Sequence, residues 1–179
     1  MKGVVFTEFL DMVESRFSAN MVDDIIDDAD LASGGAYTSV GTYPFQEMAA
    51  LVGALSRASG QPAGALIHAF GYYLFGRFAQ VYPDSLVGKD NTFSLLCCIE
   101  NSIHVEVLKL YPEAELPRFA VESMDDTTLV LRYDSPRCLG ELAKGLIQGA
   151  LDHYHECGVI REEALKADGS SMRFTVELT

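Results

Sequence analysis

The sequence predicts an α+β fold, with a helical N-terminal subdomain followed by a C-terminal antiparallel sheet and one long helix in the order ββαββ. Up to Tyr111, apolar residues recur at helical spacing, and after Pro117 they alternate with polar residues as they do in strands. Two turn sequences, Asp125-Asp126 and Asp168-Gly169-Ser170, divide the second part into pairs of strands. The 179 residues contain no linker-like segment, which predicts one domain over residues 1–179.

Two helices and a long loop are expected first. Residues 3–17 carry apolar side chains on one broad face, which is typical of an amphipathic helix. Residues 20–29 form an acidic helix that ends before a pair of glycines. Residues 36–43 are rich in Gly, Ser, Thr and Tyr and lack a helical period, so we expect a loop there.

Prolines mark the next two helices. Pro44 is expected as the first helical residue, with Thr42 as the cap, in a helix that runs to Ser59. Pro62 opens a strongly apolar helix that ends before Pro83. Both assignments use the missing N–H of proline, which is tolerated only at the start of a helix.

The C-terminal part alternates between strands and a helix. Residues 118–122 and 128–133 are expected to be two strands. Ser135-Pro136 is expected to start a long helix for which Gly158 is the C-cap. Two further strands complete the order, at residues 159–165 and 172–178.

Composition excludes several classes of function. The net charge of −13 argues against binding nucleic acid and against docking on an anionic membrane. The four cysteines show no CxxC spacing and are expected to be reduced thiols. We find neither a signal peptide nor a membrane-spanning stretch, which predicts a soluble, cytoplasmic protein.

One histidine lies in an apolar helical stretch that Pro112 stops. At 3.6 residues per turn, His104 shares a face with Cys97, Glu100, Val107, Leu108 and Tyr111. A neutral imidazole on a rigid, half-apolar helix is suited to bind iron. The same pattern also describes a hydrogen-bonded histidine of the core, and this stretch by itself leaves both interpretations open.

A second motif, Tyr133-Asp134-Ser135-Pro136-Arg137, lies where a strand is expected to end and a helix to begin. The free N–H groups of a helix start favour an anion. Tyr133, Ser135 and Arg137 are spaced by two residues, so their side chains can project to one side and bind carboxylates. The alternative is that Ser135 is only a helix cap and Tyr133 only a strand residue.

Together these motifs resemble the bacterial H-NOX domain, the haem–nitric oxide/oxygen binding family that is similar to the sensor domain of soluble guanylate cyclase. The resemblance spans essentially the whole chain. It rests on Ile103-His104-Val105-Glu106-Val107 and on Tyr133-x-Ser135-x-Arg137 at this separation. Three further stretches also match, namely Met1-Lys2-Gly3, residues 35–43 and Ala69-Phe70-Gly71.

The resemblance implies a cofactor and a role for each matched residue. The cofactor is haem b (iron protoporphyrin IX), buried between the helical subdomain and the sheet. His104 matches the axial iron ligand, and Pro117 matches a proline that presses on the porphyrin. Tyr133, Ser135 and Arg137 match the trio that holds the haem propionates. The distal wall would be built from Val5, Phe9, Leu74, Phe78, Leu142 and Leu146.

The expected distal wall differs from that of oxygen-binding members. Those members carry a distal tyrosine whose hydroxyl donates to O₂, whereas Leu142 matches that position here, and Leu74 lies where a supporting polar residue can occur. NO and CO need no such donor, so an apolar wall favours them over O₂. Some members also hold zinc near the C-terminus, but residues 166–172 contain no Cys or His, which predicts no zinc site.

We therefore expect a nitric oxide sensor and not an enzyme. The sequence shows no activated nucleophile and no paired-carboxylate signature. The resemblance implies a histidine kinase or a diguanylate cyclase as a partner in trans, without indicating which. An oxygen-binding haem sensor or carrier, and a haem-free small-molecule binding module, remain the alternatives.

Overall fold

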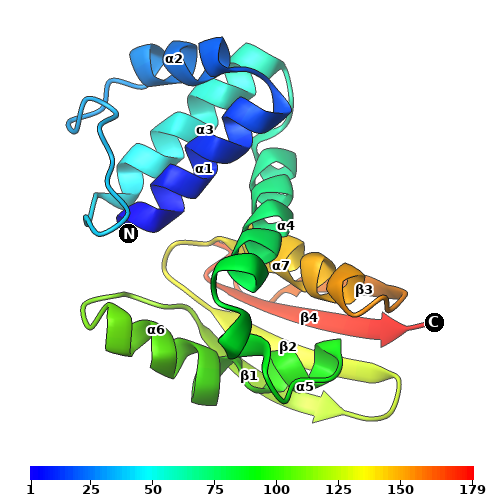
Figure 1. The fold of residues 1–179 in the computed structure, drawn as a ribbon. Coiled ribbons are helices and arrows are strands. Elements are labelled where there is room, and N and C mark those ends of the chain that lie inside the picture. The colour runs from blue at the N-terminus through cyan, green and yellow to red at the C-terminus, as the bar shows by residue number, and fades with distance from the viewer. The chain divides into compact units, whose positions relative to one another are not determined.

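The computed structural model describes all residues from 1 to 179 and contains seven α-helices and a four-stranded sheet. The chain forms two compact units, Met1–Phe70 and Gly71–Thr179. The boundary falls inside α4 (Ala63–Val81), so this helix contributes residues to both units. The fold class predicted from the sequence, helices followed by an antiparallel sheet with a long helix, is confirmed (Figure 1).

The N-terminal unit contains α1 (Gly3–Arg16), α2 (Ala19–Asp28), α3 (Phe45–Ser59) and the start of α4. Helical spacing places the apolar side chains of α1 on one face, where Phe6, Phe9 and Val13 are fully buried. In α2, Ser18 caps the first turn by accepting a hydrogen bond from Met21 N at 3.1 Å.

The connection between α2 and α3 is a loop, as predicted, and it is fastened to α1. Gly3 N donates to Gly41 O at 2.8 Å, and a Cβ on Gly3 would lie 1.8 Å from Thr38 O, so only glycine fits there. The Tyr37 ring stacks on Phe6 at a centroid distance of 4.5 Å, and Tyr43 meets both rings edge-on. The loop therefore packs against the core residue Phe6 through its two half-buried tyrosines.

The start of α3 differs from the prediction by one residue. Pro44 is the N-cap and Phe45 is the first helical residue. The predicted cap, Thr42, is wrong, because its hydroxyl instead accepts from Lys2 Nζ at 2.9 Å in a bridge between the N-terminus and the loop. The backbone pairing of Lys2 with Thr42 holds Thr42 away from the helix end.

The sheet of the C-terminal unit has the strand order β1-β2-β4-β3, and all neighbours are antiparallel. The strands are β1 (Arg118–Met124), β2 (Thr128–Asp134), β3 (Gly158–Ala164) and β4 (Ser171–Leu178). Alternation places one set of side chains in the core beneath α5 (Thr92–Cys97) and α7 (Gly140–His153). The buried members of this core are Phe93, Leu96, Leu129, Leu131, Tyr133, Ala143, Ile147, Leu151, Phe174 and Val176.

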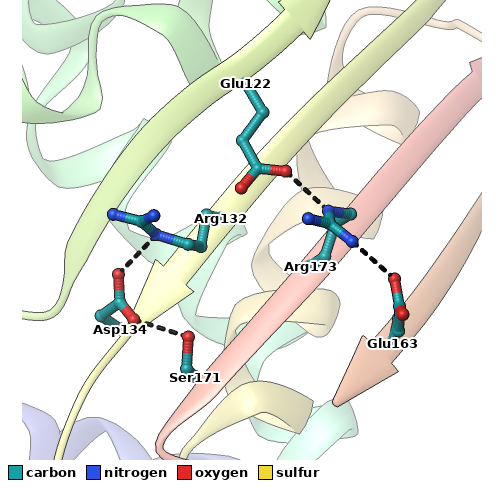
Figure 2. Close-up of polar contacts among 6 residues, drawn as sticks. All are labelled: Glu122, Arg132, Asp134, Glu163, Ser171 and Arg173. Carbon is teal, nitrogen blue, oxygen red and sulfur yellow. Dashed lines mark hydrogen bonds and ion pairs between the residues drawn. The ribbon is translucent and has the colours of Figure 1, made fainter. Parts of the chain in front are cut away.

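The other face of the sheet carries charged residues (Figure 2). Arg173 donates to Glu122 at 2.6 Å and to Glu163 at 2.8 Å, which links β4 to β1 and β3. Asp134 accepts from Arg132 and from Ser171 Oγ, at 2.9 and 2.6 Å, and so fastens the end of β2 to the start of β4. Ion pairs near the surface, such as those of Arg173, contribute little to stability, so this face is held mainly by the strand pairing itself.

The limits of α7 differ from the prediction at both ends. The helix begins at Gly140 and not at Ser135, because Ser135 Oγ accepts from Arg137 N and Cys138 adopts a left-handed conformation with φ of 52°. It ends at His153, and the predicted C-cap, Gly158, is instead the first residue of β3. His155 supplies the reversal, with φ of 56°.

Glycines allow α4 and α7 to approach closely within the C-terminal unit. A Cβ on Gly71 would lie 2.2 Å from the backbone oxygen of Leu142, and a Cβ on Gly149 would lie 2.7 Å from Phe75 Cβ. These contacts fix the two helices side by side. No helix of the structure combines the length and the apolar character needed to cross a membrane.

Candidate functional site

His104 follows a π-helical segment. The sequence predicts one helix through residues 97–111, but the structure has α5, a π-helical segment at Ile99–Ile103, and then α6 (His104–Leu110). In the π-helical segment, the N–H groups of Ile103 and His104 donate to carbonyls five residues earlier. Such wide turns are rare and are frequently found at functional sites. This segment sets the direction of the His104 side chain.

The His104 imidazole is mostly covered and has one nitrogen engaged. Its side chain is 14% exposed, and Nδ1 lies 3.1 Å from Glu100 Oε1. Burial lowers the pKa of His104 below its ordinary value, although the charge and hydrogen bond of Glu100 oppose this effect. The imidazole is therefore neutral at pH 7, with Nε2 available as an electron-pair donor.

An aromatic side chain joins His104 to the second motif. The Phe119 ring in β1 lies 6.1 Å from the His104 ring and 5.4 Å from the Tyr133 ring, between centroids. The register of the strands pairs Phe119 directly with Tyr133. The axial-ligand candidate and the first residue of the propionate motif thus belong to one packed group.

The motif at the end of β2 presents hydroxyl groups in a tight turn. Tyr133 is 2% exposed, and its hydroxyl accepts a hydrogen bond from Leu139 N at 3.2 Å. Burial raises the pKa of Tyr133, against the effect of hydrogen bonds with Ser135 and Leu139. Ser135 is also buried. The motif lies in the connection before α7, so the predicted helix start does not contribute to it.

Arg137 completes the motif and is 19% exposed at its side chain. Its guanidinium donates to the Glu115 carbonyl at 2.9 Å and to the Glu115 carboxylate. Glu115 is 83% exposed at its side chain, so its carboxylate can be exchanged for another anion at little cost. The fork of Arg137 is thus already oriented by a carboxylate.

The remaining predicted residues lie in both units. Pro117 is half-buried directly before β1. Leu74 is buried on α4, where Phe78 is half-buried, and Leu142 and Leu146 are half-buried on α7. Val5 and Phe9 belong to the N-terminal unit, where Phe9 packs edge-on against Phe70 at 5.2 Å. Within the C-terminal unit, the close contact of α4 with α7 brings these two helices together.

The N-terminal unit also has an open surface groove. It contains none of the predicted site residues and has a mixed polar and apolar character. Its lining residues are Met12, Arg16, Phe17, Gln61, Leu66 and Ala69.

The donor set of the C-terminal unit fits haem. Iron porphyrins take a neutral imidazole as an axial ligand, and their propionates require cationic and hydroxyl donors. His104 can supply the imidazole, and Tyr133, Ser135 and Arg137 can supply the hydroxyl and cationic donors. Helical spacing placed Glu100 on the face of His104 without indicating a role for it, and no sequence pattern indicated Phe119 or Glu115 as neighbours of these motifs.

Comparison with known proteins identifies the family. The model described as haem-NO-binding matches residues 2–161. The chain belongs to the haem-NO-binding family. Haem is the cofactor of this family, and its domains act as haem-based gas sensors, so the predicted resemblance and the predicted cofactor are confirmed.

Solved structures of haem-NO-binding proteins share the complete fold. The unliganded Fe(II) H-NOX protein from K. algicida is 38% identical with a TM-score of 0.95, over 100% of this chain and 97% of that chain. The H-NOX protein from S. oneidensis in the Fe(II)NO state is 28% identical with a TM-score of 0.91, over 100% and 99%. A variant from T. tengcongensis, 18% identical over 100% and 98% with a TM-score of 0.88, shares the fold alone. No curated protein sequence matches the chain.

Proposed function

We propose that this chain is a nitric oxide sensor that binds ferrous haem through His104 and signals to a partner protein in trans. The observation that carries the proposal is the neutral, mostly covered imidazole of His104, whose Nδ1 is engaged by Glu100 while Nε2 has no hydrogen-bond partner. Family membership supports haem as the group that Nε2 binds.

When bound, haem supplies an iron atom with an open position for a diatomic gas. His104 would bind the iron through Nε2, and Pro117 would contact the porphyrin. Tyr133, Ser135 and Arg137 would hold the propionates, and Arg137 would exchange the exposed carboxylate of Glu115 for that of the cofactor. The roles of Pro117 and of the three propionate residues rest on their match to the family.

The distal wall is proposed to be apolar and to select NO and CO over O₂. Its members are Val5, Phe9, Leu74, Phe78, Leu142 and Leu146. None of these side chains can donate a hydrogen bond, and O₂ bound to haem depends on such a donor for stability whereas NO does not. The S. oneidensis relative, whose structure is in the Fe(II)NO state, supports NO as the ligand.

The partner is proposed to be a histidine kinase or a diguanylate cyclase. The signal that it reads would be the position of α6, because α6 carries His104 and is exposed over most of its length. Val105, Leu108 and Leu110 are 42%, 41% and 61% exposed, so α6 offers apolar surface to another protein. A change at His104 would therefore be transmitted directly to this surface.

The test is the visible absorption spectrum of the purified, haem-reconstituted ferrous protein. We expect a Soret band that shifts on addition of NO and of CO and is unchanged in air apart from slow oxidation. A stable new spectrum in air would replace the proposal with oxygen sensing or carriage. Failure to take up haem would leave a haem-free binding module.

The axial ligand is tested separately with His104→Gly. We expect a five-coordinate ferrous spectrum to be lost and then restored by added imidazole. His153→Gly is the matched control, since His153, the last residue of α7, packs against Phe75 of α4 and against Tyr154 and is not proposed as a ligand. Unchanged ligation in His104→Gly without imidazole would overturn the assignment.

A further inference from the structure

Glu100 holds two groups with one carboxylate oxygen. Its Oε1 lies 3.1 Å from His104 Nδ1 and accepts a hydrogen bond from Phe119 N at 2.7 Å. The first group belongs to the first residue of α6 and the second is in β1, so the Glu100 side chain joins the π-helical segment both to α6 and to the edge of the sheet. The Glu100 side chain is 36% exposed, and the imidazole that it contacts is 14% exposed.

The chemistry of this contact selects one form of the imidazole. A neutral imidazole carries its proton on either Nδ1 or Nε2, and the other nitrogen keeps the free electron pair. A carboxylate can only accept hydrogen bonds, so its position at Nδ1 places the proton there. The electron pair is then on Nε2, which no other group of the protein engages.

We propose that Glu100 is a positioning residue of the haem site, which fixes the Nδ1–H form and the ring orientation of His104 and thereby strengthens the bond from Nε2 to iron. The inference rests on the proposed function, because it takes His104 as the axial ligand. A carboxylate that accepts from the distant nitrogen of a ligating imidazole makes the ligand more basic.

The second hydrogen bond of Glu100 explains why the carboxylate stays in place. A glutamate on an exposed helix has several rotamers of similar energy, and fixing one of them costs conformational entropy. The Phe119 N–H removes this freedom, since it holds Oε1 from the sheet side. The Phe119 ring also packs against His104, so its backbone and its side chain act on the same imidazole.

The first experiment uses the haem-free protein and nitrogen NMR of the imidazole at pH 7. In the wild type we expect His104 to carry its proton on Nδ1. In Glu100→Ala we expect a mixture with the Nε2–H form and a changed shift of the Phe119 amide. Glu100→Gln keeps an acceptor oxygen without the charge and should retain most of the Nδ1–H form. An unchanged proton position in Glu100→Ala would overturn the proposal.

The second experiment uses the ferrous haem protein and the iron–histidine stretching band in resonance Raman spectra. We expect a lower frequency in Glu100→Gln and a still lower one in Glu100→Ala. Haem transfer to apomyoglobin should become about 10- to 100-fold faster in Glu100→Ala, the usual effect of losing such a partner. A merely structural role of Glu100 would not change the frequency.

Glu106→Gln is the matched control, because Glu106 lies on α6 and pairs with Lys109 Nζ at 2.6 Å on the surface. It should leave both the band and the transfer rate unchanged. The two proposals fail in different ways. If the wild-type spectrum contains no band that His104→Gly abolishes, the axial assignment fails and the role of Glu100 fails with it. If that band exists but both Glu100 variants leave it unchanged, only the role of Glu100 fails.

Discussion

Arg137 is the one cation of the propionate motif, and its removal should weaken haem binding. Arg137→Ala leaves two carboxylates without their charged partner, which costs about 1.5–3 kcal/mol, or roughly tenfold to a hundredfold in affinity. The measurement is the rate of haem transfer to an apo-acceptor. Arg161→Ala is the control, since Arg161 pairs with Glu177 and is 67% exposed at its side chain. An unchanged rate for Arg137→Ala would mean that the motif is only a turn.

Leu142 decides gas selection if the distal wall is as proposed. Leu142→Tyr adds a phenol on α7, and one hydrogen bond from it to O₂ contributes about 1–1.5 kcal/mol, so we expect partial O₂ binding. The visible spectrum of the reduced variant in air measures this effect. Leu142→Phe adds a ring without a donor and should behave like the wild type. Equal spectra in air for both variants would contradict the proposed position of Leu142.

At the scale of residues, the sequence predicted which side chains belong to the candidate site from their chemistry, but it did not predict their contacts in space. The spacing of Tyr133, Ser135 and Arg137 was enough to predict an anion site, because those side chains are close in the chain. The contact of Phe119 with His104 joins a helix to a strand across 15 positions of the sequence, and no local sequence pattern predicts it. The proximity of Glu100 to His104 was predictable, since residues four apart on a helix share a face.

Among the elements, the loop before α3 depends on one buried carboxylate. Glu47 accepts from Ser33 N at 3.3 Å, from Ser33 Oγ and from Tyr37 Oη at 2.7 Å, and it is 7% exposed. Burial by itself would raise the pKa of Glu47, but the hydrogen bonds from Ser33 and Tyr37 outweigh it and lower the pKa. For the donor of this hydrogen bond, burial and the neighbouring Glu47 raise the pKa of Tyr37 to about 12.

We expect Glu47→Gln to lower the free energy of unfolding by about 1–3 kcal/mol at pH 7, the usual cost of losing hydrogen bonds to a charged group. Because the pKa of Glu47 is lowered in the folded state, its contribution is present above the unfolded value of about 4.3. It is lost as the pH falls through the lower folded value, so the difference between variant and wild type should shrink in acid.

Urea unfolding at neutral and acid pH measures this difference. Glu14→Gln is the control, because Glu14 is exposed on α1. A difference for Glu47→Gln that is independent of pH would show that shape, and not charge, holds the loop.

The packing of α4 on α7 predicts opposite effects for two glycines of one helix. Gly71→Ala forces a Cβ to within 2.2 Å of a backbone oxygen, and we expect a destabilisation of about 1–3 kcal/mol. Gly76→Ala meets nothing within 4 Å and should stabilise α4 by about 0.5–1 kcal/mol. Thermal unfolding of both variants gives the comparison. Equal shifts would show that Gly71 has room that the structure does not show.

Most elements were predictable because their signals are local. Alternating apolar residues and acidic turns located all four strands to within two residues. The errors occurred where a side chain or a backbone reversal overrides the local pattern. The hydrogen bond of Ser135 Oγ and the left-handed conformation of Cys138 move the start of α7 to Gly140. The π-helical segment divides the region that the sequence predicts as one continuous helix before Pro112.

At the scale of the whole molecule, the order of the elements carried more information than any single motif. The predicted fold class, helices followed by the order ββαββ, was correct, and solved haem-NO-binding structures match the chain over its full length. The prediction of one domain remains a prediction. The boundary between the two compact units falls inside α4, and such an internal division leaves no trace in the composition of the sequence. Helix α4 has a continuous apolar face across that point.

The π-helical segment also limits how the gene can change. A π turn holds about one residue more than the corresponding α turn, so deletion of any one residue from Ile99–Ile103 would let the chain continue as an ordinary helix. The residues after the segment would keep nearly the same facing relative to α5, because the removed residue is the one that the wide turn absorbs. A deletion between Glu100 and His104 would nevertheless change the spacing on which their contact depends, whereas a substitution at another position of the segment would keep it. A homologue with a gap here could keep the His-x-Glu-Val motif and yet lose the carboxylate contact of its histidine.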